Sequence, residues 1–405
     1  MDSNYGHLTY CSNIHPGETW EQHFLELQKH IPLIIEKCSG GKSFGIGLRL
    51  SDKASLDLQE STNLSAFLDW LKANDCYVFT MNGFPFGNFH HTVVKDKVHE
   101  PDWSTQDRVD YTIRLANILS VLLPEGIDGG ISTSPLSYRH WHDADQLDDI
   151  FKETTSRLLE VVLELISIKT KTGESIHIDI EPEPDGLLET GMEFIRWYDN
   201  YLLPIGVPLL TERFNWTTEK ATATIKEHIQ LCYDICHFAV GFEDHRQVID
   251  LLKQKNIRIG KIQISAALKA RLSSTTAERG EVMNAFKQFN ESTYLHQVIA
   301  LQQDGSFKKY RDLPDALKDA ANPSAIEWRS HFHVPIFVEN FGVLQSTQQD
   351  IVTVLNYHKQ QRMTNHLEIE TYTWEVLPDS LKLTITDSII RELEWVRENL
   401  ELQVS

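Results

Sequence analysis

The chain has 405 residues, of which 41% are hydrophobic, 10% aromatic and 24% charged, a composition that excludes disordered and fibrous proteins. Lys and Arg number 38 against 58 Asp and Glu, and the formal charge of −20 opposes diffuse attraction to nucleic acid or anionic lipid. The five cysteines form no CxxC pair, which argues against a disulfide framework and against a four-cysteine zinc site.

No apolar run approaches the roughly 18 residues that a membrane-spanning helix needs. Residues 1–10 have neither the basic region nor the apolar region of a signal peptide. We therefore expect a cytoplasmic protein that does not insert into a membrane and does not bind nucleic acid.

Short β-rich runs alternate with amphipathic helices along most of the chain. The predicted strands cover residues 8–14, 44–50, 77–82, 130–134, 176–181, 231–237, 257–265 and 367–373. The predicted helices cover residues 18–37, 62–74, 104–123, 145–170, 188–202, 217–230, 245–255 and 380–400. This alternation predicts an α/β protein, specifically a closed (β/α)8 TIM barrel, which commonly takes about 250 residues.

The excess length falls in two places. Residues 81–103, rich in Gly, Pro, His and Phe, follow a strand as a loop at the barrel mouth would. Residues 267–360 form a long insertion before the last strand, for which we expect a helix over 279–304, a polar turn over 304–310 and an amphipathic segment over 313–321. We interpret the insertion as a lid on a single domain that spans residues 1–405, because no linker separates two halves.

Acidic side chains stand where three of the predicted strands end. Alternation in SIHIDIEPEPD places polar residues on one side of a strand that ends at Glu181, and Glu183 follows in the loop. Asp234 and His237 lie three apart at the end of another apolar strand. A lone acid at a strand end is usually only solvated, but barrel chemistry lies at these ends, and several acids there favour a common ligand.

The last predicted strand adds Glu368 and Glu370 on one face, with Glu370 nearer its end. The acid-bearing strands carry no Lys or Arg to pair with these acids. Carboxylates with nearby imidazoles suit a divalent ion bound by oxygen and nitrogen, with Zn or Mn preferred over Mg or Co.

His331 and His333 lie two apart in the insertion and would share a face of an extended segment. They could complete the coordination of such an ion, and a packed or exposed pair is the evenly weighted alternative. Cys232 and Cys236 fit buried small residues better than ligands. The candidate substrate-binding residues are His15, Asn82, Glu183, Arg213 and Trp374.

At these residues the sequence resembles the xylose isomerase-like barrel superfamily, which includes ketose 3-epimerases, inosose dehydratases and type IV apurinic endonucleases. The resemblance implies metal ligands at Glu181, at Asp234 of the DxxH motif, and at Glu370. The sequence departs from the pattern on strand seven, where Gln263 stands in place of the usual His. Either Gln263 binds the ion through its carbonyl oxygen, or a histidine of the insertion replaces the imidazole. We favour His333 slightly, ahead of His331.

Five segments are similar, more narrowly, to the EboE family of metabolite traffic proteins. They are YCSNIHPGETW, IEPEPDG, CYDICHFAV, HFHVPI and ETYTWEVLP. The family implies a bacterial gene cluster for export or maturation of secondary metabolites, with a prenyltransferase, a TatD-like hydrolase and a dehydroquinate synthase-like cyclase beside it. The resemblance therefore implies a pathway, and other proteins of the cluster as partners, better than it implies a reaction.

The leading hypothesis is a divalent-metal-dependent isomerase or epimerase of a sugar, cyclitol or similar polyhydroxylated metabolite. A metal chelated by adjacent carbonyl and hydroxyl oxygens stabilises the enediolate that forms when the α-proton leaves. Glu181 and Glu370 would act as base and acid, and His237 would hold a substrate oxygen.

Three alternatives stay open because the barrel fold does not fix function. Dehydration of a cyclitol is a close variant of the same chemistry. A non-catalytic carrier would bind a metabolite and return it unchanged. Phosphodiester hydrolysis also uses this barrel, but the charge of −20 and the scarcity of basic residues near the motifs oppose a nucleic-acid groove. The insertion could cover the site of its own chain or that of a neighbour in an oligomer.

Overall fold

The computed structural model describes residues 2–87, 90, 93–375, 377 and 384–401. Its larger sheet has the strand order β1-β2-β15-β8-β7-β6-β5-β4-β3, in which β1 (Asp2–Ser3) pairs antiparallel at one edge and the other eight strands run parallel. These eight are β2 (Gly6–Tyr10), β3 (Phe44–Arg49), β4 (Cys76–Asn82), β5 (Gly129–Thr133), β6 (Ile176–Ile180), β7 (Ile229–Asp234), β8 (Ile259–Ile264) and β15 (His366–Ile369).

The sheet nearly closes on itself between its edge strands. A parallel bridge joins Cys11, just past β2, to Gly47 of β3, and the N–H of Gly47 donates to the Thr9 hydroxyl at 3.1 Å. The fold is therefore the predicted TIM barrel, in which the carboxyl ends of all eight strands open at one end.

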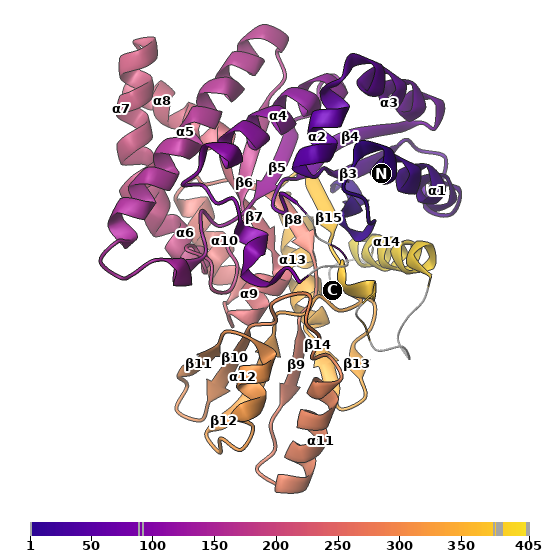
Figure 1. The fold of residues 1–405 in the computed structure, drawn as a ribbon, viewed down its shortest axis with the longest axis vertical. Helices are drawn as coiled ribbons and strands as arrows, with labels where there is room; N and C mark the ends of the chain where they lie inside the picture. The colour runs from indigo at the N-terminus through magenta and orange to yellow at the C-terminus, as the bar shows by residue number, and fades with distance from the viewer. Residues whose placement is uncertain (1, 88–89, 91–92, 376, 378–383, 402–405) are drawn as a thin grey trace.

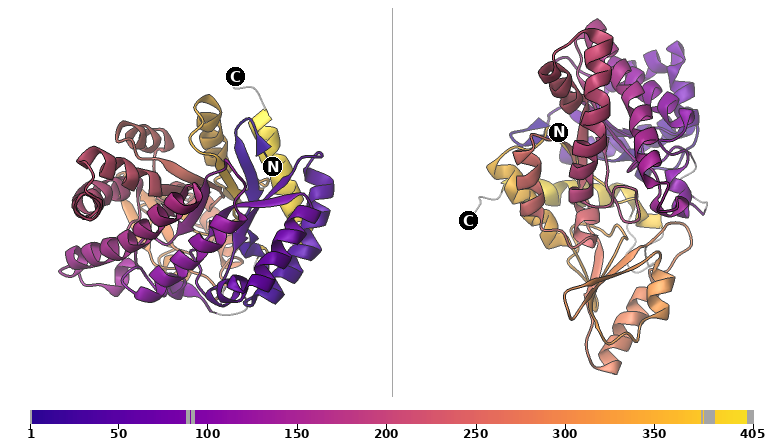
Figure 2. Two further views of the ribbon diagram at one scale, coloured as in Figure 1. Left: turned by 90° about the horizontal axis from the view of Figure 1, so that it is seen from above. Right: turned by 90° about the vertical axis from the view of Figure 1, so that its left-hand side faces the viewer.

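Helices surround the barrel (Figure 2). They are α1 (Trp20–Cys38), α2 (Asp52–Gln59), α3 (Ser61–Ala73), α4 (Gln106–Leu122), α5 (Leu147–Thr172), α6 (Gly191–Trp197), α7 (Leu203–Phe214), α8 (Thr218–His228), α9 (Ile235–Val240), α10 (His245–Gln254), α13 (Gln348–Gln360) and α14 (Ile385–Glu401). Helix α1 shows why they form: Thr19 and Gln22 make a capping box, and Leu27, Ile31 and Ile34 bury one stripe. Within the described residues, no helix is both long and apolar enough to cross a membrane.

The insertion carries its own antiparallel sheet, which lies at one end of the barrel in Figure 1. The strand order is β11-β10-β12-β9-β14-β13. The strands are β9 (Leu268–Arg271), β10 (Val298–Gln302), β11 (Phe307–Tyr310), β12 (Ala325–Ser330), β13 (Asn340–Phe341) and β14 (Leu344–Ser346), with helices α11 (Thr276–Lys287) and α12 (Leu313–Lys318).

The helix predicted over 279–304 is wrong beyond its first part. Helix α11 ends at Lys287, and β10 then pairs with β11 and β12. The polar turn that we expected is a β-hairpin whose second strand begins at Phe307. Pairing with residues that are distant in sequence decides the conformation of such a short apolar run, and periodicity does not reveal that pairing.

The strand predicted over 231–237 also ends early. Asp234 is the last residue of β7 and caps α9, because its carboxylate accepts the backbone N–H of His237 at 3.1 Å. The cap turns the chain at the barrel mouth and keeps both side chains of the DxxH motif at that end.

Candidate metal-binding pocket at the barrel mouth

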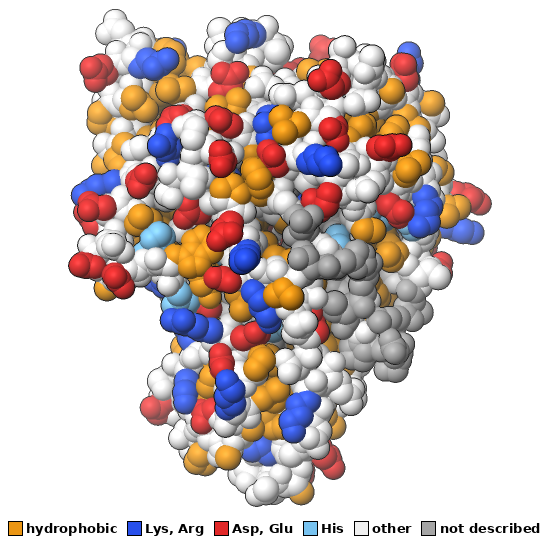
Figure 3. All heavy atoms as spheres, in the orientation of Figure 1, with side chains coloured by type: hydrophobic (Ala, Val, Ile, Leu, Met, Phe, Trp, Pro, Cys, Tyr) orange, Lys and Arg blue, Asp and Glu red, His pale blue; other side chains and the backbone are white. Residues whose placement is uncertain are grey.

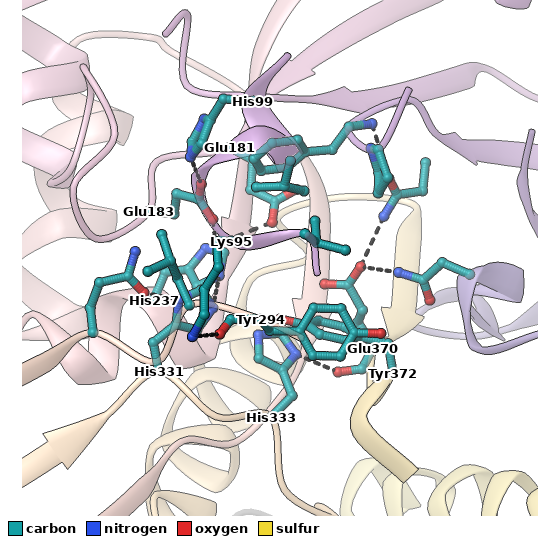
Figure 4. A pocket seen from close by; sticks show the side chains of 18 residues that line it. Lys95, His99, Glu181, Glu183, His237, Tyr294, His331, His333, Glu370 and Tyr372 are labelled. Carbon is teal, nitrogen blue, oxygen red and sulfur yellow. Dashed lines mark hydrogen bonds and ion pairs between the residues drawn. The ribbon is translucent and has the colours of Figure 1, made fainter. Parts of the chain in front are cut away.

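A pocket of about 570 Å³, part of it open to solvent, lies at the carboxyl ends of the barrel strands. Its walls come from strand ends, from the 81–103 loop and from the insertion (Figure 4). The lining residues are Asn13, Asn82, Phe84, Pro85, Val94, Lys95, Val98, His99, Glu181, Glu183, His237, Tyr294, Leu295, Gln297, His331, His333, Glu370 and Tyr372.

Glu370 follows β15 and points into the pocket. Its Oε1 accepts two hydrogen bonds, from Asn13 Nδ2 at 2.8 Å and from Asn82 Nδ2 at 2.9 Å. Burial raises the pKa of Glu370 well above its usual value, and the nearby carboxylate of Asp234 raises it further. The two amides therefore fix the orientation of a carboxyl group that is costly to ionise without a cation.

Glu181 follows β6 and is 2% exposed. Burial raises its pKa well above the usual value, and the carboxylates of Glu370 and Asp234 raise it further. Its nearest polar neighbours are His237 Nδ1 at 3.7 Å and the Cys232 thiol at 3.7 Å. Acids gathered in this way favour a bound cation, which would offset their mutual repulsion.

The third acid, Asp234, is fully buried and has one carboxylate oxygen to spare. Oδ1 accepts from the N–H of His237 at 3.1 Å and from the Ser265 hydroxyl at 2.7 Å. Oδ2 has no hydrogen-bond partner among the described residues.

Three histidines present their Nε2 atoms in the pocket. Nδ1 of each faces an acceptor, which fixes the tautomer: Pro182 O lies 3.0 Å from His237 and Glu370 O lies 2.8 Å from His333. Nδ1 of His331 lies 2.9 Å from Oε1 of the Gln297 side-chain amide. Each neutral ring therefore directs an Nε2 lone pair into the pocket, the arrangement that a metal-binding histidine requires.

These lone pairs lack protein donors. Nε2 of His237 and Nε2 of His331 lie 3.1 Å apart, so two acceptors face each other, and Nε2 of His333 has no hydrogen-bond partner in the described part of the chain. Burial lowers the pKa of His237 and of His331 well below the usual value, which disfavours relief by a proton. A bound cation would satisfy both rings, so the residues fit a bound metal.

Several groups of donors here meet the spacing that one ion needs. The ligand atoms of Asp234, His237 and His333 lie within 4.8 Å of one another, and so do those of Glu183, His237 and His331 and those of Cys236, His331 and His333. Glu183 also accepts from His99 Nε2 at 2.8 Å. His333 thus belongs to a group of donors that could share one ion with both residues of the DxxH motif.

Gln263 does not line this pocket. Its Oε1 lies 2.9 Å from the Cys232 thiol, which donates to it, and its side chain is fully buried. The choice between Gln263 and His333 as the strand-seven ligand stays a prediction.

Glu368, which we grouped with Glu370 by alternation, is already paired. Its Oε2 accepts from Lys261 Nζ at 2.8 Å, and both side chains are 0% exposed. Lys261 comes from β8, which pairs with β15, the strand that carries Glu368. The sequence of β15 alone does not reveal this neighbour.

Of the predicted substrate-binding residues, Asn82 and Glu183 line the pocket and three others do not. His15 is buried, with Nε2 2.8 Å from the Tyr10 hydroxyl. Trp374 is buried and stacks on Phe337. Arg213 is exposed in the last turn of α7 and does not line the pocket.

The pocket also contains residues that the sequence did not single out. Lys95 and His99 belong to the 81–103 loop, whose histidines were the only signal. Tyr294 and Gln297 come from the insertion, and Tyr372 follows β15. Lys95 Nζ binds Asp312 at 2.7 Å and Tyr294 O at 2.7 Å.

On the face that Figure 3 shows, acidic and basic side chains of the described residues are interspersed.

No protein-family model matches the chain, and no curated protein matches it. Solved structures show likeness at low identity. An L-ribulose 3-epimerase is 10% identical with a TM-score of 0.49, over 98% of this chain and 94% of that one. The IolI protein, solved with a zinc atom, is 13% identical with a TM-score of 0.48, over 97% and 98%.

The probable 3-DHS dehydratase AsbF from Bacillus anthracis is 12% identical with a TM-score of 0.43, over 96% of this chain and 98% of that one. Two further neighbours are described as xylose isomerase domain proteins. At this level these likenesses carry no information about the substrate of this protein. The TIM-barrel fold is established by the strand order itself.

Proposed function

We propose that this protein is a divalent-metal-dependent isomerase or epimerase that moves a proton on the carbon beside a carbonyl of a sugar or cyclitol. The observation that carries the proposal is the pair of buried glutamates, Glu181 and Glu370, beside imidazoles whose Nε2 atoms lack protein donors. Their strands, β6 and β15, are separated in the sheet by β7 and β8, so a substrate between them could meet a carboxyl group on either face.

The residues that would hold the metal are Glu181, Asp234, His333 and Glu370. Asp234 Oδ2 and His333 Nε2 are buried and have no hydrogen-bond partner among the described residues, which supports this assignment. Oxygen and nitrogen donors of this kind suit Zn or Mn. Such an ion would polarise adjacent carbonyl and hydroxyl oxygens and so make the neighbouring C–H bond more acidic.

Glu181 and Glu370 take opposite roles in proton transfer, one as base and the other as acid. Burial raises the pKa of both, Asp234 raises both further, and Glu370 also raises that of Glu181, so the group that ionises first acts as the base and the protonated one as the acid. Asn13 and Asn82 hold Oε1 of Glu370 and leave Oε2 for the reaction. His237 lies beside both Glu181 and Glu183 and can hold a substrate oxygen.

The walls of the pocket limit access of water. Phe84 and Pro85 come from the 81–103 loop, and Tyr294 and Leu295 come from the insertion. Exclusion of water strengthens electrostatic interactions inside the site and protects a reactive carbanion equivalent from side reactions.

The five segments similar to the EboE family support a substrate from bacterial secondary metabolism and partners encoded in the same cluster. A cyclase-like neighbour in such clusters favours a cyclitol. Both assignments are part of the proposal.

The test is proton exchange with solvent. Zn- or Mn-loaded protein is incubated with a panel of ketoses and keto-cyclitols in deuterated water, and loss of the α-proton signal is followed by NMR. We expect Glu181→Gln and Glu370→Gln to reduce exchange about 100-fold or more, because a positioned acid or base contributes about 100- to 10,000-fold. Glu243→Gln is the matched control, since Glu243 is a largely buried glutamate outside the pocket.

Two results would contradict the proposal. Full activity of Glu370→Gln on an exchanging substrate would remove the acid/base assignment. A compound that binds tightly and returns without exchange would support the carrier function instead.

A further inference from the structure

A second group of metal-ligating side chains lies at the opposite end of the barrel. Asp128 directly precedes β5, His177 lies near the start of β6, and His366 is the first residue of β15. Their ligand atoms lie within 4.8 Å of one another. None of the three lines the pocket at the barrel mouth.

The distances between these atoms are too long for hydrogen bonds but fit ligands that share one ion. Asp128 Oδ2 lies 3.7 Å from His177 Nε2, and Asp128 Oδ1 lies 3.6 Å from His366 Nε2. Both distances exceed the hydrogen-bond range. Two ligands on a tetrahedral zinc, each about 2.0–2.1 Å from the metal, are separated by roughly 3.4 Å.

His366 is the unsatisfied member of the group. Its side chain is 0% exposed, and neither ring nitrogen has a hydrogen-bond partner among the described residues. A buried imidazole with no partner for either nitrogen is costly, and buried polar groups are nearly always satisfied. A metal on Nε2 would supply one partner.

His177 is oriented as a metal ligand. Its Nδ1 donates a hydrogen bond to Asp179 Oδ1 at 2.6 Å, so in the neutral ring the Nε2 lone pair is directed toward Asp128 and His366. A carboxylate behind a histidine in this way orients and strengthens metal-binding imidazoles. Asn365 Nδ2 similarly donates to Asp128 Oδ1 at 3.1 Å.

Two glycines make room for the group inside the barrel. A Cβ on Gly130 would lie 2.7 Å from His177 Cε1 and 2.9 Å from His366 Nδ1, and a Cβ on Gly260 would overlap the Asp179 carboxylate. A side chain at either position would displace the imidazoles. The space for the group therefore depends on the two glycines as well as on the ligands themselves.

We propose that Asp128, His177 and His366 bind a structural zinc ion at the amino-terminal end of the barrel, with water as the fourth ligand. The side chain of Asp128 is 39% exposed, which gives an ion and a water molecule access from solvent. The ion links β15 to β5 and β6 across the barrel, because β8 and β7 separate them in the sheet. Residues at this end of such barrels serve stability rather than catalysis.

The experiment separates this site from the pocket. The starting protein is the double variant His333→Ala/Glu370→Gln, called the background, which lacks two of the proposed ligands in the pocket. It is stripped with a chelator, reloaded with Zn²⁺ or Co²⁺, and examined by elemental analysis and by the visible absorption of tetrahedral Co²⁺. We expect the background to bind about one equivalent of metal per chain. Asp128→Asn or His366→Gln, each added to the background, should abolish this binding.

His228→Gln is the matched control, because His228 is a buried histidine whose Nδ1 bonds Ile176 O near the start of β6, outside the group. It should keep the metal. Asp128 is partly exposed and Asp128→Asn is nearly isosteric, so this variant tests the site even if His366→Gln fails to fold.

The proposal is overturned if the background binds no metal after reloading, or if folded Asp128→Asn binds Zn²⁺ as tightly as the background does. The group would then be a hydrogen-bonded ion network without a metal. Neither result bears on proton exchange by the intact pocket, so failure of this inference and failure of the proposed function are distinguishable.

Discussion

Asn13 holds Glu370 through a single side-chain contact. Its Nδ2 donates to Glu370 Oε1 at 2.8 Å, and its Oδ1 has no hydrogen-bond partner in the described residues. Asn82 donates to the same oxygen, but its Oδ1 also accepts the N–H of Phe84, so its loss would disturb the 81–103 loop as well. Asn13 is therefore the better position at which to test how a neutral donor orients this carboxylate.

We expect Asn13→Ala to weaken metal binding in the pocket about 10- to 100-fold, because residues that orient a metal ligand typically contribute that much to affinity. Competition with a chromophoric chelator measures the Zn²⁺ dissociation constant. Asn117→Ala is the control: it removes an amide that donates to Ile113 O at 2.9 Å on the outer helix α4. Equal affinities of the two variants would show that Glu370 is not a ligand held by Asn13.

At the level of elements, the barrel strands were predictable because their residues are buried on both faces. All five residues of β6 are buried, and its short run, with β-branched Ile at every second position, indicates a strand. Helix α7 was missed because it contains Pro208 and has Pro204 in its first turn, and proline normally interrupts or starts a helix.

The same contrast holds for the site. Glu181, Asp234 and Glu370 were found because strand ends converge at the mouth of any such barrel. Tyr294 and Gln297 were not, because their position depends on how the insertion packs against the 81–103 loop, a contact between distant parts of the chain. Local sequence patterns do not encode such contacts.

Helix α14 contributes one buried acid, Glu392, that accepts hydrogen bonds from residues close to the pocket. Glu392 Oε1 accepts from the Thr371 hydroxyl at 2.8 Å and from the N–H of Ile336 at 3.2 Å. Thr371 follows Glu370, and Ile336 lies three residues after His333. Burial raises the pKa of Glu392 from 4.5 to about 8, so the folded protein keeps it protonated near neutral pH.

This raised pKa predicts a loss of stability as the pH rises. Between about 4.5 and 8 the folded state holds a proton that the unfolded state has released, so the free energy of unfolding decreases with pH over that window, on the order of 3–5 kcal/mol in total. Glu392→Gln mimics the protonated acid and should remove this decrease. Urea unfolding at pH 5.5 and at pH 8.5 measures it.

In that comparison the variant should be the more stable protein at pH 8.5. Glu398→Gln, an exposed position on the same helix, should keep the pH dependence of the wild type. Parallel curves for wild type and Glu392→Gln would mean that Glu392 ionises in the folded protein near its ordinary pKa.

At the scale of the whole molecule, the pocket exists only where the barrel and the insertion meet. The N–H groups of Val94 and Lys95 both donate to Thr293 O, at 2.7 and 3.0 Å, and thus join the 81–103 loop to the insertion. The Lys95 ammonium strengthens this junction, because it reaches both Asp312 and Tyr294 O at 2.7 Å. Asp312 Oδ1 in turn accepts the N–H of His296 at 3.1 Å.

We therefore expect Lys95→Gln to loosen the junction while the barrel stays intact. The side chains of Lys95 and Asp312 are 24% and 17% exposed, and such a pair contributes roughly 0.2–1 kcal/mol, or at most about a fivefold change in local opening. Hydrogen exchange should accelerate at residues 94–95 and 294–296 and stay unchanged in the barrel strands. Lys308→Gln breaks a comparable pair with Asp319 inside the insertion and should leave residues 94–95 protected as in the wild type. If Lys95→Gln exchanged no faster than Lys308→Gln at these amides, backbone pairing alone would hold the insertion over the barrel mouth.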